Sequence, residues 1–340
     1  MKKIFTSLVK KKILLFIFII LFFSFLFLDK SFSSDYSAYF RRFVTAELYL
    51  KNYWDNFFFS FINYVFFLTD FNYEEYLKII FTIFCSIFFL IIYELLKLNK
   101  SYDSKNFIYI LILLIFFSIL FLLEFLIIRL RAGICIVMML ASFLFYLKCQ
   151  NKTSIIFLVC SLLTHSHTAI IMFVGSFFLI FLVKLKKISG YQETLILIFL
   201  SFLILFTINY FNITTLKNSE ITIKPLSIYR VILYYIIPAL VILNIKIKGN
   251  RFLLRKKAKN FTEAYLKMFF IIVVTSLISI ITFGLQNAGQ DLVRFFGVIT
   301  ILMIFTIFNK QYFKHAIILN FYIITINSIL FYKNFYYLFK

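Results

Sequence analysis

Proline, glycine and acidic residues are scarce in this chain of 340 residues, which holds 2 prolines, 7 glycines and 14 Asp and Glu residues. The sequence contains no Pro-rich linker, low-complexity tract or internal repeat. No stretch has the composition of a separate soluble domain. These absences predict a single domain over 1–340.

Cysteine and histidine are also rare, with four and three copies respectively. The cysteines have no CxxC spacing, and most lie in apolar segments, where a small buried residue is the usual role. Two of the histidines lie close together, but His315 is expected on the opposite side of the membrane. We therefore expect no metal and no cofactor. The four cysteines are Cys85, Cys135, Cys149 and Cys160.

Apolar residues, in contrast, make up 63% of the chain, and the mean hydropathy is +0.98. Apolar runs of about 20 residues recur, long enough to cross a hydrocarbon core of about 30 Å. The sequence predicts an all-α polytopic integral membrane protein with about 11 transmembrane helices. Because no A-x-A site follows the first run, we interpret that run as an uncleaved span. The predicted spans lie near 13–28, 75–96, 107–127, 131–147, 153–166, 167–183, 192–211, 229–245, 264–283, 292–308 and 315–332.

The net charge of +22 comes from basic residues in short loops between the apolar runs. This placement sets membrane orientation and favours contact with lipid headgroups, so we expect no nucleic-acid partner. The Lys-rich N-terminus is predicted to be cytoplasmic, and 246–260 is the most basic cytoplasmic loop. The outer segment 29–74 is rich in acidic residues.

Two stretches are too short for the number of membrane crossings that this orientation requires of them. The apolar run 56–68 has too few residues to span comfortably, and a crossing there would invert every later loop. We therefore predict a re-entrant or interfacial helix on the outer side. Both ends of 153–183 are basic, yet the stretch is short for two spans. Its turn at 164–168 is then expected below the outer membrane surface, in a recess open to the outside.

Four basic or titratable residues are predicted at this outer depth: Arg129 and Arg131 at one junction, His165 and His167 at the turn. Such residues are costly inside a membrane and are often functional. The arginines either bind a pyrophosphate or another anion, or extend to lipid headgroups and end the helices. The histidines act as a general base or hydrogen-bond donor, or form a hydrogen-bonded buried pair.

Further polar residues are expected on the outer side. Asp35 follows the first span and is either a catalytic carboxylate or a helix cap. Arg294 opens a late span and either contributes to the site or pairs with Asp291 on the helix face. The polar loop before it suits contacts to sugar hydroxyls. The other candidate binding residues are Arg230, Asn287 and Gln290.

Four segments resemble the EpsG-like, Wzy-type polymerases of bacterial exopolysaccharide, capsule and O-antigen. Asp35–Tyr39 follows the first span, and Arg131–Leu140 is similar to the family's Arg-Gln-x-Leu-Ala helix start. Leu162–Ile170 is similar to its His-x-Ser-Ala segment, and Arg294 begins a later span. This sequence departs from the pattern at Cys135, where Ala is usual, and it lacks a long outer loop.

The resemblance implies polymerisation of oligosaccharide repeat units carried on undecaprenyl pyrophosphate, at the outer face of the bacterial inner membrane. Arg131, with Arg129 or Arg294, would stabilise the leaving pyrophosphate. His165, His167 or Asp35 would accept a proton from the acceptor hydroxyl. Membrane lipids, a saccharide flippase and a chain-length regulator are the further partners that such a function implies.

Three alternatives remain open at this point. A multi-span glycosyltransferase with a lipid-phosphate sugar donor would also have an early outer Asp, but Asp35 has no acidic neighbour to complete a metal site. A transporter or flippase of lipid-linked saccharides would favour internal repeats and Gly- or Pro-broken helices, which are missing here. A membrane acyltransferase would use the histidines.

Overall fold

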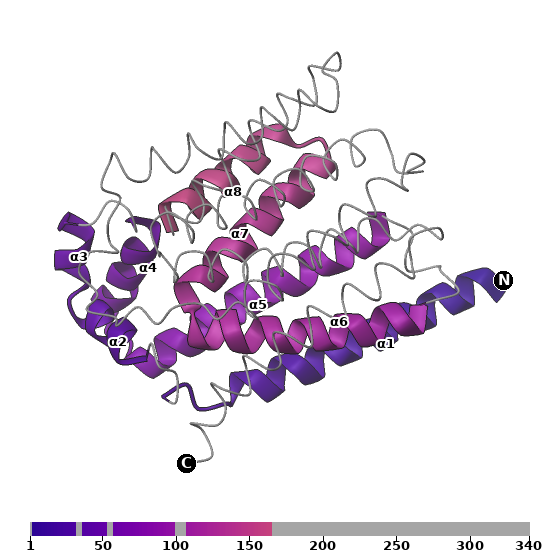
Figure 1. Ribbon diagram of the computed structural model, residues 1–340, viewed down its shortest axis with the longest axis horizontal. Coiled ribbons are helices and arrows are strands. Elements are labelled where there is room, and N and C mark those ends of the chain that lie inside the picture. Colours follow the sequence, from indigo (N-terminus) through magenta and orange to yellow (C-terminus); the bar gives the residue numbers. More distant parts are fainter. Residues whose placement is uncertain (1, 32–35, 53–56, 99–106, 165–340) are drawn as a thin grey trace, which may run out of the picture. The chain divides into compact units, whose positions relative to one another are not determined.

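The structure is a computed structural model, and it describes residues 2–31, 36–52, 57–98 and 107–164 (Figure 1). All of them belong to one of the two compact units of the chain, which comprises Met1–Ala169 and Asn327–Lys340. Within these ranges every regular element is a helix and no strand occurs, which confirms the all-helical class for this part. The spans predicted beyond Thr164 lie outside the described residues, and the single domain over 1–340 stays a prediction.

The helices follow the predicted apolar runs closely. Helix α5 is the one described helix that is both long and apolar enough to cross a bilayer, over Tyr73–Lys97. The run predicted as 107–127 is divided between an α-helix and a π-helix, η3. The elements are α1 (Lys2–Leu26), α2 (Tyr36–Val44), α3 (Ala46–Asn52), α4 (Phe57–Leu68), α5 (Tyr73–Leu98), α6 (Phe107–Phe121), η3 (Leu122–Ile128), α7 (Leu130–Leu147) and α8 (Asn151–Thr164).

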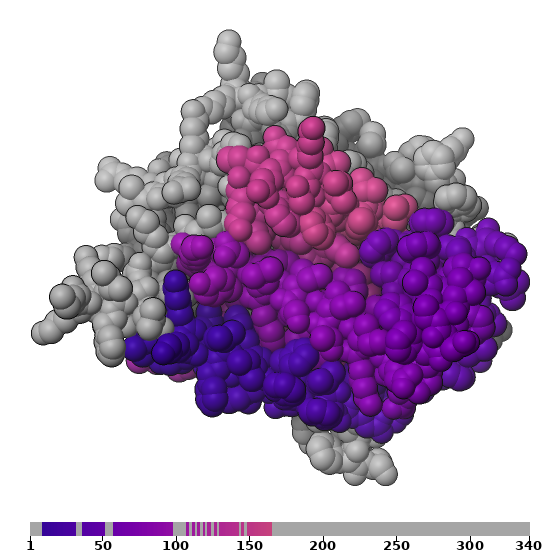
Figure 2. Space-filling model, turned by 180° about the vertical axis from the view of Figure 1, so that it is seen from behind, coloured from indigo at the N-terminus to yellow at the C-terminus, as the bar shows by residue number. Residues whose placement is uncertain are grey.

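Helices α1 and α5 lie side by side and run in opposite directions (Figure 1). Phe18 stacks on Phe89 with 4.2 Å between ring centroids, and Phe22 stacks on Phe81 at 6.2 Å. The aromatic rings of α1 therefore meet those of α5 in reverse order along the chain. Figure 2 shows the far face of the described residues, from the indigo of the N-terminal helix to the pink of α8.

Basic residues from separate predicted inner junctions meet at one end of these helices. Glu94, near the end of α5, binds Lys148 after α7 at 2.7 Å and Lys97 at 3.7 Å. The Nζ of Lys10 in α1 lies 5.2 Å from the ring centroid of Phe107, the first residue of α6. The basic residues near the start of α1 and at the ends of α5 and α7 thus lie at the same end of these helices. We call this the basic end.

Helix α5 starts with a capping box, at the end opposite to the basic end. Asn72 Oδ1 accepts from the Glu75 backbone N–H at 2.9 Å, and Glu75 Oε2 accepts from the Asn72 N–H at 3.1 Å. This reciprocal pair satisfies two donors that a helix start leaves unpaired. Glu74 and Glu75 also complement the positive end of the helix dipole. The sequence Asn-Tyr-Glu-Glu therefore fixes where α5 starts.

Helix α4, predicted as a re-entrant or interfacial outer helix, packs at this same end. Its Asn63 accepts a hydrogen bond from the Tyr76 hydroxyl, and both side chains are buried. Tyr76 also contacts the ring of Phe43 in α2, at 4.9 Å between centroids. α4 therefore lies at the end of α5 that is remote from the basic end. There its aromatic residues join α2 to the first turn of α5.

The Asn63–Tyr76 hydrogen bond predicts a clear non-additivity. Tyr76→Phe and Asn63→Leu should each lower the free energy of unfolding by about 1–3 kcal/mol, because each leaves a buried polar atom unpaired. The double variant should lose less than the sum of the two. Thermal unfolding of the detergent-purified protein measures this. Tyr36→Phe is the matched control, since its exposed bond to Glu74 is 3.5 Å long, and an equal loss in that variant would contradict the prediction.

Candidate functional site

Arg129 and Arg131 lie at the junction of η3 and α7, remote from the basic end. The Gly133 N–H donates to the Arg129 carbonyl at 3.0 Å, so the first hydrogen bond of α7 closes on Arg129. Arg131 then falls in the first turn of that helix. A π-helical segment such as η3 adds an extra residue to the helical path, and such segments occur frequently at functional sites. The change from the π-helix to the next α-helix thus coincides with the two arginines that the sequence analysis identified.

Two features of this junction are typical of anion-binding sites. Both arginines are half-buried, and the Nε of Arg131 is buried. The first turn of a helix presents backbone N–H groups and the positive end of the helix dipole. Guanidinium charge at this place adds to that field, whereas cations are usually found at the other end of a helix. A phosphate or pyrophosphate would be stabilised by both contributions.

Helices α7 and α8 pack closely through small side chains. The Ser142 hydroxyl donates to the Ser154 carbonyl at 2.8 Å, and the Ser154 hydroxyl donates to the Ser142 carbonyl at the same distance. Two turns away, the Ser161 hydroxyl donates to the Cys135 carbonyl at 3.1 Å. Small residues with hydroxyl groups permit this close approach in an apolar environment. The pairing order makes the two helices antiparallel.

This register brings the end of α8 to the start of α7. One turn before Cys135 lies Arg131, and less than one turn after Ser161 lies Thr164, the last residue of α8. Thr164 is buried, and its hydroxyl donates to the Cys160 carbonyl at 2.6 Å. The described part of the site therefore consists of the two arginines, the first turn of α7 and the end of α8.

His165 directly follows Thr164 in the sequence but lies outside the described residues. The predicted contact between the histidines and the arginines stays a prediction for that reason. The same holds for the other predicted site residues beyond the described ranges. These are Asp35, His167, Arg230, Asn287, Gln290, Asp291 and Arg294.

Lys30 is a buried cation that the sequence analysis did not single out. Its side chain is 7% exposed, its Nζ donates to the Leu26 carbonyl at 3.3 Å, and it lies 5.4 Å from the Phe81 ring centroid. Burial lowers the pKa of Lys30, and the positive charge of Lys78 lowers it further. Lys30 closes the C-terminus of α1, where a cation complements the helix dipole. Its position in the sequence, just after an apolar run, is the only signal that could have indicated this role.

No group of three or more His, Cys, Asp or Glu side chains in the described ranges is arranged to hold a metal ion. No protein-family model, curated protein or solved structure matches the chain.

The α7–α8 register predicts a specific cross-link. Cys135 Sγ lies 3.1 Å from Ser161 Oγ, so Ser161→Cys should form a disulfide with Cys135 on oxidation with copper phenanthroline. The background carries Ala at the other three cysteine positions. The measurement is the loss of both thiols' reactivity toward a maleimide reagent that is added after denaturation, because both positions are buried in the folded protein. Ile156→Cys, an exposed position on the same helix, is the control. Cross-linking in the control instead would show a different register.

Proposed function

We propose that the chain is a polytopic protein of the bacterial inner membrane, with a cytoplasmic N-terminus and about 11 spans. The length and apolar character of α5 support this placement. The meeting of Lys97 and Lys148 at Glu94 supports it independently, because both belong to junctions predicted to be cytoplasmic. In this orientation the junction of η3 and α7 faces the outer side.

On this placement the chain is a polysaccharide polymerase that transfers a saccharide from undecaprenyl pyrophosphate to a lipid-linked repeat unit at the outer face. The observation that carries the proposal is the positive junction at Arg129 and Arg131, with the end of α8 beside it. The resemblance of four sequence segments to EpsG-like, Wzy-type polymerases supplies the substrate class. The same positive junction would also suit a lipid-phosphate sugar donor, which is the alternative that the experiment below distinguishes.

The reaction would run between three groups. The acceptor hydroxyl oxygen attacks the anomeric carbon, the bond from that carbon to the pyrophosphate oxygen breaks, and the pyrophosphate leaves with the electron pair. Arg131, with Arg129 or Arg294, stabilises this charge through guanidinium hydrogen bonds. His165, His167 or Asp35 takes the proton of the acceptor hydroxyl.

The sequence distance between the proposed base and the described site is short. His165 is the residue that directly follows Thr164, the last residue of α8. The end of α8 lies beside the first turn of α7, which supports the pairing of a histidine with Arg131. The polar outer residues Asn287, Gln290 and Asp291, with Arg230, are proposed to contact sugar hydroxyls.

Arg131→Ala is expected to lower polymer formation by roughly 100-fold or more, because it removes a donor to the leaving pyrophosphate. A strain lacking the chain should carry single repeat units on its lipid, and the Arg131→Ala strain should match it. Saccharide length on gels and protein level on immunoblots are the measurements. Arg41→Ala, an exposed arginine of α2, is the control. Full-length polymer in the deletion strain would contradict the polymerase, and accumulation of a lipid-phosphate sugar would favour the alternative.

Accessibility labelling tests the orientation without reference to activity. Single cysteines at positions 131 and 165 should react with a membrane-impermeant maleimide added outside the cell, and cysteines at 97 and 152 should react only after permeabilisation. Labelling of 131 and 165 from opposite sides would contradict the proposed site.

A further inference from the structure

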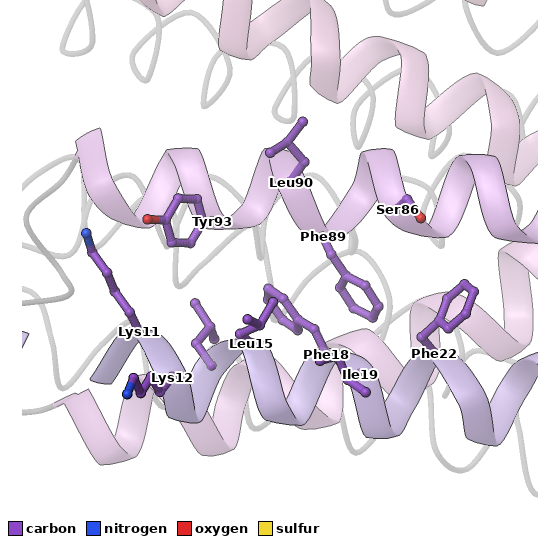
Figure 3. Close-up of a pocket in the computed structure, with 11 residues that line it drawn as sticks. Lys11, Lys12, Leu15, Phe18, Ile19, Phe22, Ser86, Phe89, Leu90 and Tyr93 are labelled. Atoms are coloured by element: carbon purple, nitrogen blue, oxygen red, sulfur yellow. The ribbon is translucent and has the colours of Figure 1, made fainter. Parts of the chain in front are cut away.

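A groove of about 570 Å³ runs between α1 and α5 (Figure 3). It lies on the surface of these two helices, mostly within the predicted membrane spans, and apart from the junction at Arg131. Three apolar residues on its walls are exposed, Leu15 at 61%, Ile19 at 44% and Leu90 at 60%. The remaining lining residues are Lys11, Lys12, Leu14, Phe18, Phe22, Ser86, Phe89 and Tyr93.

One end of the groove is cationic and the rest is apolar. Lys11 and Lys12 line it near the basic end, and Figure 3 shows the Lys11 amine and the Tyr93 hydroxyl directed toward that same end. Beyond them the walls are leucine, isoleucine and phenylalanine, with Ser86 as the one polar residue, as far as Phe22. The charge is therefore complementary to a negative headgroup attached to an apolar chain.

The length of the groove matches one leaflet of a bilayer. Lys11 and Phe22 are separated by about 16 Å along α1, at roughly 1.5 Å per residue. Half of a hydrocarbon core of about 30 Å is about 15 Å. With the lysines at the cytoplasmic surface, the apolar part of the groove reaches the middle of the membrane.

We propose that this groove binds an anionic phospholipid of the cytoplasmic leaflet. Lys11, Lys12 and the Tyr93 hydroxyl hold its phosphate, and one acyl chain lies along Leu15, Ile19 and Leu90. The proposal rests on the membrane orientation given above and is independent of polymerase activity. It assigns a lipid site on the side of the membrane opposite to the proposed chemistry.

Native mass spectrometry of the full-length protein in detergent tests the headgroup contact. Phosphatidylglycerol should bind more tightly than phosphatidylcholine. The double variant Lys11→Gln/Lys12→Gln should lower the affinity for phosphatidylglycerol about 30-fold. Each basic residue near an anionic surface contributes about 1 kcal/mol, and about 1.4 kcal/mol corresponds to tenfold. Lys97→Gln/Lys152→Gln removes the same charge near the basic end, outside the groove, and should keep the affinity. Equal weakening in this control would overturn the proposal.

A second pair of variants tests the acyl-chain contact. Ser86→Phe fills the groove without changing charge and should lower phosphatidylglycerol affinity at least fivefold, whereas Ile83→Phe, exposed on α5 outside the groove, should not. Displacement of the lipid by inorganic phosphate would show an anion site without a lipid tail and overturn the proposal. A change of oligomeric state in Ser86→Phe would show a subunit interface and overturn it too. Arg131→Ala should bind phosphatidylglycerol normally, so failure of the polymerase and failure of the lipid site are distinguishable.

Discussion

The close antiparallel contact of α7 and α8 is the constraint on which the proposed active site depends. Ser142 and Ser154 exchange hydrogen bonds through their hydroxyls and carbonyls. Two turns further along, Ser161 makes a similar bond to Cys135. Burying a serine hydroxyl without a partner costs free energy, and the observed register gives a partner to each of these three hydroxyls. That register sets the end of α8 at the level of Arg131, so a packing interaction decides where a chemical group can stand.

Charge is arranged differently at the two ends of the described helices. At the basic end, Glu94 holds two lysines from separate junctions, and each cation there can reach water or a lipid headgroup. At the other end, Arg129 directly precedes α7 and Arg131 stands in its first turn, where the helix dipole does not favour a cation. An arrangement of this kind is useful when an anion binds there, which is the physical basis of the proposed pyrophosphate site. Lys30, in contrast, serves the end of α1 and has a structural role.

Long apolar helices were predicted well because their signal is local. Positions 75–96 became α5 with only two extra residues at each end, and 56–68 became α4 with one fewer. The start of α1 at Lys2 lies well before the predicted span 13–28, because that span was bounded by its apolar residues, whereas lysines are also good helix formers. The short helices α2 and α3 and the π-turn before Arg129 were also missed. Each depends on contacts with neighbouring helices more than on its own apolar run.

Composition and the spacing of charges determined by themselves that the described part of this chain is helical and apolar, and which ends of its described helices are basic. Those properties follow from how each segment interacts with water, lipid and its own backbone. Only the tertiary structure decided that Asn63 pairs with Tyr76, that α7 and α8 share one register, and that α1 and α5 leave a groove open toward Lys11. These features arise from the shapes and hydrogen-bonding groups of side chains on different segments, which no single stretch of sequence specifies.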